Sequence, residues 1–299
     1  MSIVICRLPK AGLGNQLFPL LKALTFAELN GLPIIIIGYH QLKLGPYFRL
    51  EKYKRRYNNY FIFQKSVLGE KIDQWRLLRK KHLNKQIEPS VEYVRDKAAT
   101  IFEYNAIPSW KNYFEGLKEH RNTVIKLLWK NMRADIKEKI ERYKSPSIGV
   151  HIRMGDFRKL KEGEDFSKVG AVRTSEKYFI DIIENIRKVN GSSLPVSVFT
   201  DGYKSEFKEL FSLNNLYLVE GNSDIVDMML LSKSSIIVCS AGSTFSYWAG
   251  FLANAPLILH PDHIHDSIRT NEINNNWYEG PWDSTNTLLI DNIINISIN

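Results

Sequence analysis

The sequence predicts an α/β protein made of two Rossmann-like domains, each built on a parallel sheet, that face each other across a cleft. In the second half, apolar runs of strand length alternate with amphipathic helical segments and short loops, as in a doubly wound sheet covered on both faces. The first half begins in the same way. The pattern changes at residues 143–149, so we expect domains at residues 1–145 and 146–299.

The second half is read from its apolar periodicity. One helix is expected to begin at Asp224, because a short carboxylate at the N-cap accepts hydrogen bonds from the first free N–H groups of a helix. The other expected elements are strands at residues 146–152, 194–201, 215–221, 234–240 and 255–260, and helices at residues 175–189, 204–210 and 243–253.

The first half is regular only near its two ends. Aromatic and basic segments without a clear period run through Leu83, and the asparagine-rich tail after Asn271 is equally hard to assign. The expected elements are strands at residues 2–8 and 33–37, a helix between them that follows a glycine turn and ends at Asn30, and helices at residues 122–129 and 133–143.

Composition is that of a globular protein with a substantial core: 299 residues, 44% hydrophobic and 24% charged. The longest apolar run, Pro33–Ile37, falls far short of the roughly 20 residues of a membrane span. The N-terminus lacks the residue order of a signal peptide, so we expect a cytoplasmic protein. Cys6 and Cys239 each end an apolar run and are expected to be buried free thiols.

The charge is unevenly distributed along the chain. Residues 1–150 hold 28 Lys and Arg against 13 Asp and Glu, a net charge of +15, whereas residues 151–299 hold 13 against 19, a net charge of −6. The basic first half suits an anionic partner, such as an anionic membrane surface or a phosphate-bearing acceptor. It contains no known nucleic-acid reading motif, so nucleic acid is not an expected partner.

Polar residues gather at three expected strand ends, which is where open parallel sheets bind ligands. The first cluster lies within Arg7–Gln16, in the stretch KAGLGNQL. Its glycines Gly12 and Gly14 would allow positive φ and close approach of a ligand, although an ordinary tight turn has the same pattern. The stretch is neither a dinucleotide fingerprint nor a P-loop. Asn15 and Gln16 add hydrogen-bond donors that could face a sugar.

The other two clusters suit an anion. His151–Asp156 follows a buried strand and offers Arg153, whose guanidinium can hold a diphosphate and neutralise charge on a leaving group. No D-x-D triplet is present to hold a metal instead, and His151 taken alone reads as a structural histidine. Hydroxyls and N–H groups at a helix start form the third cluster, which contains Ser240, Gly242, Ser243 and Thr244.

A fourth polar group, Asp201, ends the strand at 194–201. Its carboxylate suits the N1–H and amino group of guanine.

Three segments taken together, GLGNQLF, HIRMGDF and GSTFSYWAGFL, resemble the α-1,2-fucosyltransferases of glycosyltransferase family 11. They are more distantly similar to the α-1,6- and protein O-fucosyltransferases. The resemblance implies a GT-B fold and inverting transfer of L-fucose from GDP-L-fucose, without an obligate metal or other cofactor. The acceptor it implies is a hydroxyl, the 2-OH of a galactose-like residue, in an oligosaccharide or lipid-linked glycan of a surface polysaccharide or lipopolysaccharide.

The resemblance also assigns roles to residues. Arg153 would hold the β-phosphate, His151 and Asp201 would lie by the guanosine, and residues of the first domain would lie near fucose and acceptor. Two positions depart from the family pattern: Met154 stands where a second arginine is usual, and Ala11 stands where a glycine is usual. The implied catalytic residues are Arg153, Asp156 and Asn15, and the implied donor-binding residues are Gly14, Gln16, His151, Asp201, Ser240, Ser243, Thr244 and Phe245.

Several alternatives stay open. The general base is Asp156 or a carboxylate of the loop Glu162, Glu164 and Asp165, and Asp156 could instead pin the arginine loop. The donor could be another GDP-sugar, such as GDP-mannose. The chain could also be a non-catalytic nucleotide- or glycan-binding protein with the same fold.

Overall fold

The chain divides into two compact units in this computed structural model. One unit comprises Met1–Lys43 with Arg55–Glu138, and the other comprises Leu44–Lys54 with Lys139–Asn299. The predicted domain boundary, between residues 145 and 146, lies in the loop that precedes strand β5, and the roles of the two domains stay predictions. The structure describes residues 2–41, 44–52, 54–55, 57–80, 82–94, 99–263 and 265–297.

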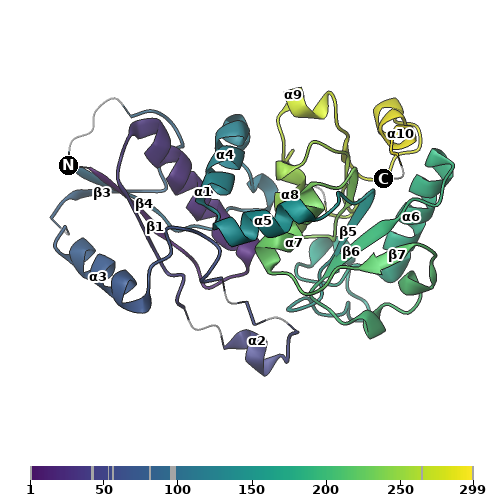
Figure 1. The fold of residues 1–299 in the computed structure, drawn as a ribbon, viewed down its shortest axis with the longest axis horizontal. Helices are drawn as coiled ribbons and strands as arrows, with labels where there is room; N and C mark the ends of the chain where they lie inside the picture. Colours follow the sequence, from purple (N-terminus) through teal and green to yellow (C-terminus); the bar gives the residue numbers. More distant parts are fainter. Residues whose placement is uncertain are drawn as a thin grey trace. The chain divides into compact units, whose positions relative to one another are not determined.

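The second unit contains a six-stranded sheet in which every neighbouring pair is parallel (Figure 1). The chain adds the first three strands toward one edge, returns to the centre and adds the next three toward the other edge, as in a doubly wound fold. The spatial order is β10-β9-β8-β5-β6-β7, with β5 Ile148–Ile152, β6 Val196–Thr200, β7 Leu216–Leu218, β8 Ile236–Val238, β9 Leu257–Ile258 and β10 Glu279–Gly280.

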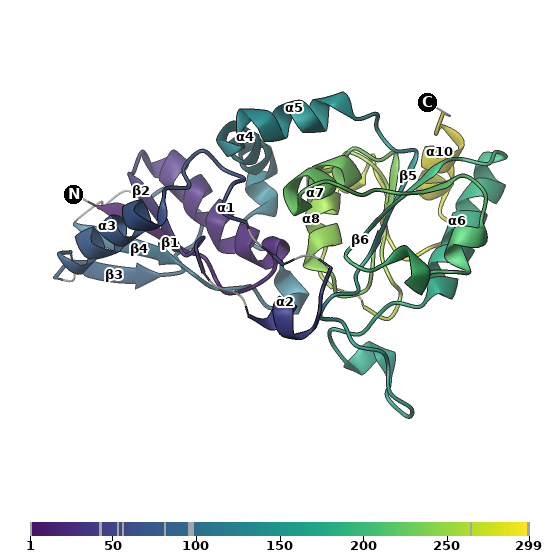
Figure 2. The same cartoon turned by 60° about the horizontal axis from the view of Figure 1, so that its bottom comes forward.

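Helices cover both faces of this sheet (Figures 1 and 2). Alternate residues of β5, such as Val150, join a buried cluster with the apolar sides of α6 and α10, while Gly149 faces Leu231 of α7. Ser175 begins α6 by accepting a hydrogen bond from the Tyr178 N–H. The helices are α6 Glu176–Asn190, α7 Asp224–Ser232, α8 Thr244–Leu252, α9 Asn271–Asn274 and α10 Thr287–Ile294.

The first unit contains a four-stranded parallel sheet in the order β2-β1-β4-β3. Helix α1 packs on one face, and Leu77 of α3 packs on the other against Ile5 and Ile101 (Figure 2). The elements are β1 Ile3–Arg7, α1 Leu13–Asn30, β2 Ile34–Ile37, α3 Val67–Leu78, β3 Asn84–Ile87, β4 Thr100–Tyr104 and α4 Arg121–Asn131.

Smaller elements complete the chain. The short helix α2, Gly45–Phe48, belongs to the second unit, and α5, Ala134–Arg142, spans the division between units. The remaining elements are short 3₁₀ turns at Trp110–Asn112, Lys118–His120, Phe166–Lys168, Lys204–Glu206 and Leu210–Ser212.

Two sequence expectations in the second unit are wrong. The predicted helix at 204–210 is replaced by the last two of those 3₁₀ turns, because the backbone leaves helical geometry at Phe207, where ψ is 55°. The N-cap of α7 is Ser223 rather than Asp224, which is the first helical residue. Both cysteines are buried free thiols, as predicted.

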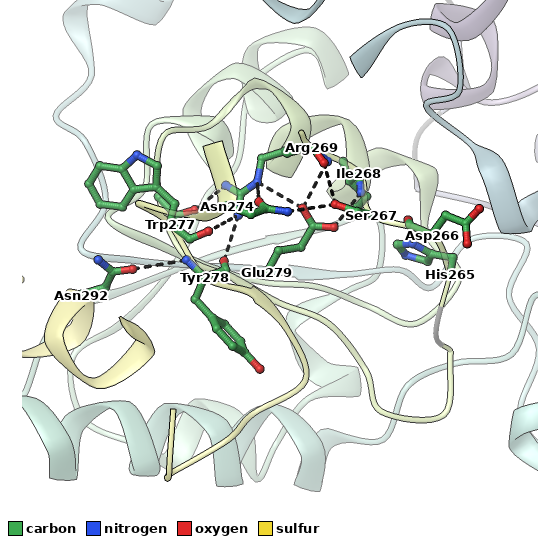
Figure 3. A network of polar contacts seen from close by, with 11 residues as sticks. His265, Asp266, Ser267, Ile268, Arg269, Asn274, Trp277, Tyr278, Glu279 and Asn292 are labelled. Carbon is green, nitrogen blue, oxygen red and sulfur yellow. Dashed lines mark hydrogen bonds and ion pairs between the residues drawn. The ribbon is translucent and has the colours of Figure 1, made fainter. Parts of the chain in front are cut away.

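The asparagine-rich tail is held by one fully buried arginine, Arg269 (Figure 3). Its partner carboxylate, Glu279, also accepts hydrogen bonds from the backbone N–H groups of Ile268 and Arg269. The guanidinium donates to the carbonyl oxygens of Ala255, Trp277 and Tyr278, to the side-chain oxygen of Asn274 and to Glu279. The network therefore ties the loop after β9 to the strand β10.

Among the described residues, no helix combines the length and apolar character that crossing a bilayer requires.

Candidate active site

The candidate site of the second unit lies where β5 and β8 end side by side, at the centre of the sheet. Backbone pairing between these strands stops at Val150 and Val238, whereas β5 stays paired with β6 to its last residue. Beyond that point Ser240 connects the two chains: its hydroxyl donates to the His151 carbonyl oxygen (2.9 Å) and accepts from the Arg153 N–H (2.8 Å). Doubly wound folds bind ligands at the point where the strand order reverses, which here lies between β5 and β8. The Ser240 side chain connects the two chain segments at this point.

Arg153 follows this strand end and is held by two carboxylates. Its Nη1 lies 2.5 Å from Oδ2 of Asp201, and its Nη2 lies 2.7 Å from Oδ1 of Asp156. Asp201 comes from the end of β6, the strand next to β5, and Asp156 comes from the turn after Arg153. A guanidinium fixed in this way is oriented before any anion arrives.

Asp201 does more than pair with a cation. Its second oxygen accepts a hydrogen bond from the Met154 N–H at 2.7 Å, so both carboxylate oxygens are engaged. In this structure Asp201 therefore positions the loop that carries Arg153 and Met154. The sequence had indicated a different role for it, a contact with guanine.

The side chain of Met154 is buried in the core. A Cβ placed on Gly202 would lie 2.7 Å from the Met154 Cγ, which shows how closely the two residues pack. Position 154 thus contributes its backbone to the site and its side chain to the core.

His151 is buried at the end of β5 and carries an unsatisfied ring nitrogen. Its Nδ1 has no hydrogen-bond partner among the residues that the structure describes, and its ring stacks on Phe245 with centroids 4.6 Å apart. Burial, helped by the charge of Arg153, lowers the pKa of His151 to about 3, so the imidazole is neutral at physiological pH. A buried polar atom without a partner is rare in proteins.

The turn from Ser240 to Thr244 leads into α8. The Ala241 N–H donates to the Thr174 hydroxyl (3.0 Å), and the Gly242 N–H donates to the Tyr247 hydroxyl (2.8 Å). Gly242 has φ of +65°, a conformation that favours glycine. The sequence analysis did not identify Thr174 or Tyr247 as site residues. Tyr247 lies within the family segment GSTFSYWAGFL, whereas no sequence signal indicated Thr174.

Ser243 is the N-cap residue of α8, but its hydroxyl makes no capping hydrogen bond with the helix backbone. The hydroxyls of Ser243 and Thr244 therefore stand at the positive end of a helix dipole, with Phe245 in its first turn. The ring of His263, another residue that the sequence did not indicate, lies 3.6 Å from the position of a Cβ on Gly242. This arrangement is suited to an anion such as a phosphate.

The glycine turn of the first unit differs from its expected geometry. Gly12 is the N-cap of α1 with φ of −64°, and Gly14 lies within the helix, so neither residue is needed for positive φ. Around Gly12 there is open space, since a Cβ would meet no atom within 4 Å. Gln16 is buried and donates to the Pro9 carbonyl oxygen (2.8 Å), whereas the side-chain oxygen of Asn15 is buried without a hydrogen-bond partner among the described residues.

Comparison of the sequence with known proteins identifies the family of this chain. The model of glycosyl transferase family 11 matches residues 9–283, nearly the whole chain. The chain belongs to glycosyl transferase family 11. It is therefore a glycosyltransferase, and the family resemblance of its motifs is confirmed. No curated protein matches it significantly.

Solved structures of fucosyltransferases share the fold, which confirms the predicted GT-B class with two parallel sheets. Fucosyltransferase NodZ from Bradyrhizobium is 17% identical with a TM-score of 0.52, over 89% of this chain and 99% of that one. NodZ α-1,6-fucosyltransferase co-crystallised with GDP is 18% identical with a TM-score of 0.51, over 86% and 94%. POFUT1 in complex with GDP is 13% identical with a TM-score of 0.51, over 86% and 97%.

The acidic loop of this family 11 enzyme is a poor source of a general base. Glu164 receives two hydrogen bonds from Arg158 (2.6 and 2.8 Å), which lower its pKa. Hydrogen bonds from Ser167 and Lys168 lower the pKa of Asp165 to about 2. A proton acceptor works best with a pKa near the working pH, so these two carboxylates are weak candidates. Within the described part of the chain, no group of three His, Cys, Asp or Glu side chains is placed to hold a metal ion.

Proposed function

We propose that this family 11 glycosyltransferase transfers L-fucose from GDP-L-fucose to a hydroxyl of a glycan acceptor, with inversion at fucose C1 and without an obligate metal. The observation that carries the proposal is Arg153, fixed at the end of β5 and linked through Ser240 to the turn that begins α8. A guanidinium and a helix N-terminus at adjacent strand ends match the two charges of a nucleoside diphosphate. The GDP complexes of NodZ and POFUT1, which share the fold, agree with this donor class.

In the proposed reaction the acceptor oxygen attacks C1 from the face opposite to GDP, and the bond between C1 and the β-phosphate oxygen breaks. Arg153 neutralises the charge that develops on the leaving diphosphate, as a metal ion does elsewhere. The hydroxyls of Ser243 and Thr244 hold the phosphate oxygens, and Phe245 lines the pocket. The acceptor proton passes to a base; the candidate is Asp156, which has to release its ion pair with Arg153 to accept the proton.

Two roles follow from the contacts around Arg153. His151 stays neutral and offers Nδ1 to the guanosine part of the donor, because its pKa is far below neutrality. Asp201 acts as a positioning residue that orients Arg153 and the loop at Met154.

The acceptor side is assigned to the first unit. We propose that residues 1–145 form the acceptor-side domain and residues 146–299 the donor-binding domain, with Gly14, Asn15 and Gln16 near fucose and acceptor. The buried oxygen of Asn15, which has no hydrogen-bond partner in the described part of the chain, and the open space at Gly12 support a ligand there. The proposed acceptor is the 2-OH of a galactose-like residue in an oligosaccharide or lipid-linked glycan, glycosylated in the cytoplasm during synthesis of a surface polysaccharide or lipopolysaccharide.

The first test is calorimetric titration with GDP-L-fucose in the presence of a metal chelator. We expect micromolar binding by the wild type and a loss of at least about 100-fold in Arg153→Ala, because a charged group on the diphosphate is removed. Arg142→Ala, at the exposed end of α5, is the matched control and should bind normally.

Other outcomes would contradict the proposal in different ways. A wild type that binds GDP-mannose but not GDP-L-fucose would be a transferase for another GDP-sugar. Binding of GDP-L-fucose with no transfer to any galactose-terminated acceptor would indicate a non-catalytic binding protein.

A further inference from the structure

Helix α3 has its polarity reversed relative to an ordinary surface helix. Its buried residues are Glu70, Asp73 and Leu77, so two of the three side chains that face the protein are carboxylates. Its large apolar side chains instead face solvent, with exposed fractions of 52% for Val67, 68% for Leu68, 43% for Ile72, 53% for Trp75 and 56% for Leu78. An ordinary amphipathic helix buries its apolar stripe, so this one has an unpartnered apolar face.

Both inward carboxylates have polar partners within the first unit, and these contacts specify the orientation of the helix. Glu70 accepts a hydrogen bond from the Gly38 N–H at 2.6 Å. Asp73 pairs with Lys65 at 2.5 Å and with Arg76 at 3.5 Å. Rotating the helix to bury its apolar face would break the hydrogen bond of Glu70 with the Gly38 N–H and the ion pair of Asp73 with Lys65. The exposed apolar face is therefore a stable feature of the fold.

The exposed charges of α3 itself are all positive. Leu68, Ile72 and Trp75 lie four and three residues apart, on one side of the helix. Lys71, Arg76 and Arg79 are exposed, and the guanidinium of Arg79 stacks 3.8 Å from the centre of the Trp75 ring. Between Val67 and Lys80 the only carboxylates are the two buried ones.

We propose that α3 is an interfacial helix that docks the first unit on an anionic lipid bilayer. Leucine, isoleucine and tryptophan side chains enter the boundary between headgroups and acyl chains, and the cations pair with lipid phosphates. A second copy of the chain fits this face poorly, because a two-fold interface would set the cations of one helix against those of the other. The inference does not rest on the proposed sugar transfer, although a lipid-linked acceptor would be reached from the same surface.

The test is cosedimentation of the full chain with vesicles of phosphatidylcholine alone or mixed 3:1 with phosphatidylglycerol. We expect strong binding only to the anionic vesicles. Lys71→Gln with Arg79→Gln should weaken it about 30-fold, since each cation near an anionic surface contributes roughly fivefold. Lys144→Gln with Lys208→Gln makes the same charge change at exposed residues of the second unit and should leave binding within about twofold.

The apolar contribution is tested separately. Leu68→Ser with Ile72→Ser should weaken binding at least about tenfold, because both side chains leave the lipid. The matched control is Ile294→Ser, which changes a residue of similar exposure on α10. Brominated lipid should quench wild-type fluorescence more than that of Trp75→Phe, which places α3 itself in the bilayer. Circular dichroism and the unfolding temperature of each variant report whether its fold is intact.

Three results would overturn the proposal: no binding of the wild type to anionic vesicles, equal binding by the α3 variants and their controls, or a wild-type dimer in sedimentation that Leu68→Ser with Ile72→Ser dissociates. The last would mean that a second copy covers the face. Donor binding is measured independently, so a chain that binds vesicles but not GDP-L-fucose would refute the proposed function alone.

Discussion

The two sheets differ in how far their edge strands are exposed: in the second sheet β7 exposes one of its three residues and β10 exposes neither of its two. Every residue of β5 and of β8 is buried, and the candidate site for the donor lies directly at their ends. In the first unit the edge strand β3 exposes all four of its residues, and α3 turns apolar side chains outward. In the second unit, fully buried strands thus position the charged groups of the candidate site. In the first unit, β3 and α3 leave exposed surface that can make other contacts.

A buried carboxylate in each unit shows the same difference. Glu279 depends on Arg269, which is fully buried, whereas Glu103 pairs with two half-exposed cations, Arg7 at 3.0 Å and Lys85 at 2.8 Å. Burial would raise the pKa of Glu103, but Lys85 and Arg7 together outweigh it and lower the pKa. Glu103 therefore keeps one cationic partner if the other is removed, whereas Glu279 loses the arginine with which it pairs.

The largest expected effect sharpens this contrast. Arg269→Ala should lower the free energy of unfolding by about 3–5 kcal/mol, because it leaves the buried Glu279 charge unpaired. Arg7→Ala should lower it by about 1 kcal/mol or less, because Lys85 still pairs with Glu103. Urea unfolding at neutral pH measures both. Similar losses for the two variants would mean that the units do not differ in this respect.

A second contrast concerns two glycines. Gly149→Ala should lower the free energy of unfolding by about 1–3 kcal/mol, because the new Cβ would lie 2.1 Å from Ser234 Oγ and 2.8 Å from Leu231 Cδ1. Gly12→Ala should change it by less than about 0.5 kcal/mol, because the space there is open. If a ligand occupies that space, Gly12→Ala will reduce transfer without affecting the unfolding temperature. Full activity in Gly12→Ala would show that no ligand approaches this glycine.

The smallest expected effect is a pH dependence centred on His151. Its folded pKa is depressed to about 3, so the stability it contributes is present above pH 6.5 and is lost as the pH falls toward 3. From pH 7 to pH 5.5 the wild type should lose about 1 kcal/mol relative to His151→Gln. Urea unfolding of both proteins at the two pH values measures this difference, in which other histidines cancel. A difference that does not change with pH would mean that the imidazole titrates alike in the folded and unfolded protein.

The sequence predicted the second sheet well because its central strands are buried on both faces and appear as continuous apolar runs. Strand β3, with the sequence NKQI, has no such signal, since all its residues face solvent. Helix α3 was missed for a related reason: buried carboxylates and exposed apolar residues invert the pattern by which helices are recognised.

Within the candidate site, the placement of Arg153 at a strand end could be predicted, but its partners could not. Asp201 is 48 positions away and meets Arg153 only because β6 lies next to β5. Gln16 looked available to a sugar, yet its side chain holds the Pro9 carbonyl, a contact that depends on the path of the loop. Residue types at strand ends indicate a kind of chemistry, whereas hydrogen-bond partners depend on the folded chain.

The strand orders of the two sheets have a consequence for synthesis on the ribosome. In the second unit β5 is made first and lies at the centre, so each later strand can add to an edge that already exists. In the first unit β4 is made last but lies between β1 and β3, so that sheet cannot close until Tyr104 has emerged. Until then the apolar edge of β1 is open to other chains, which exposes nascent molecules to aggregation during this interval.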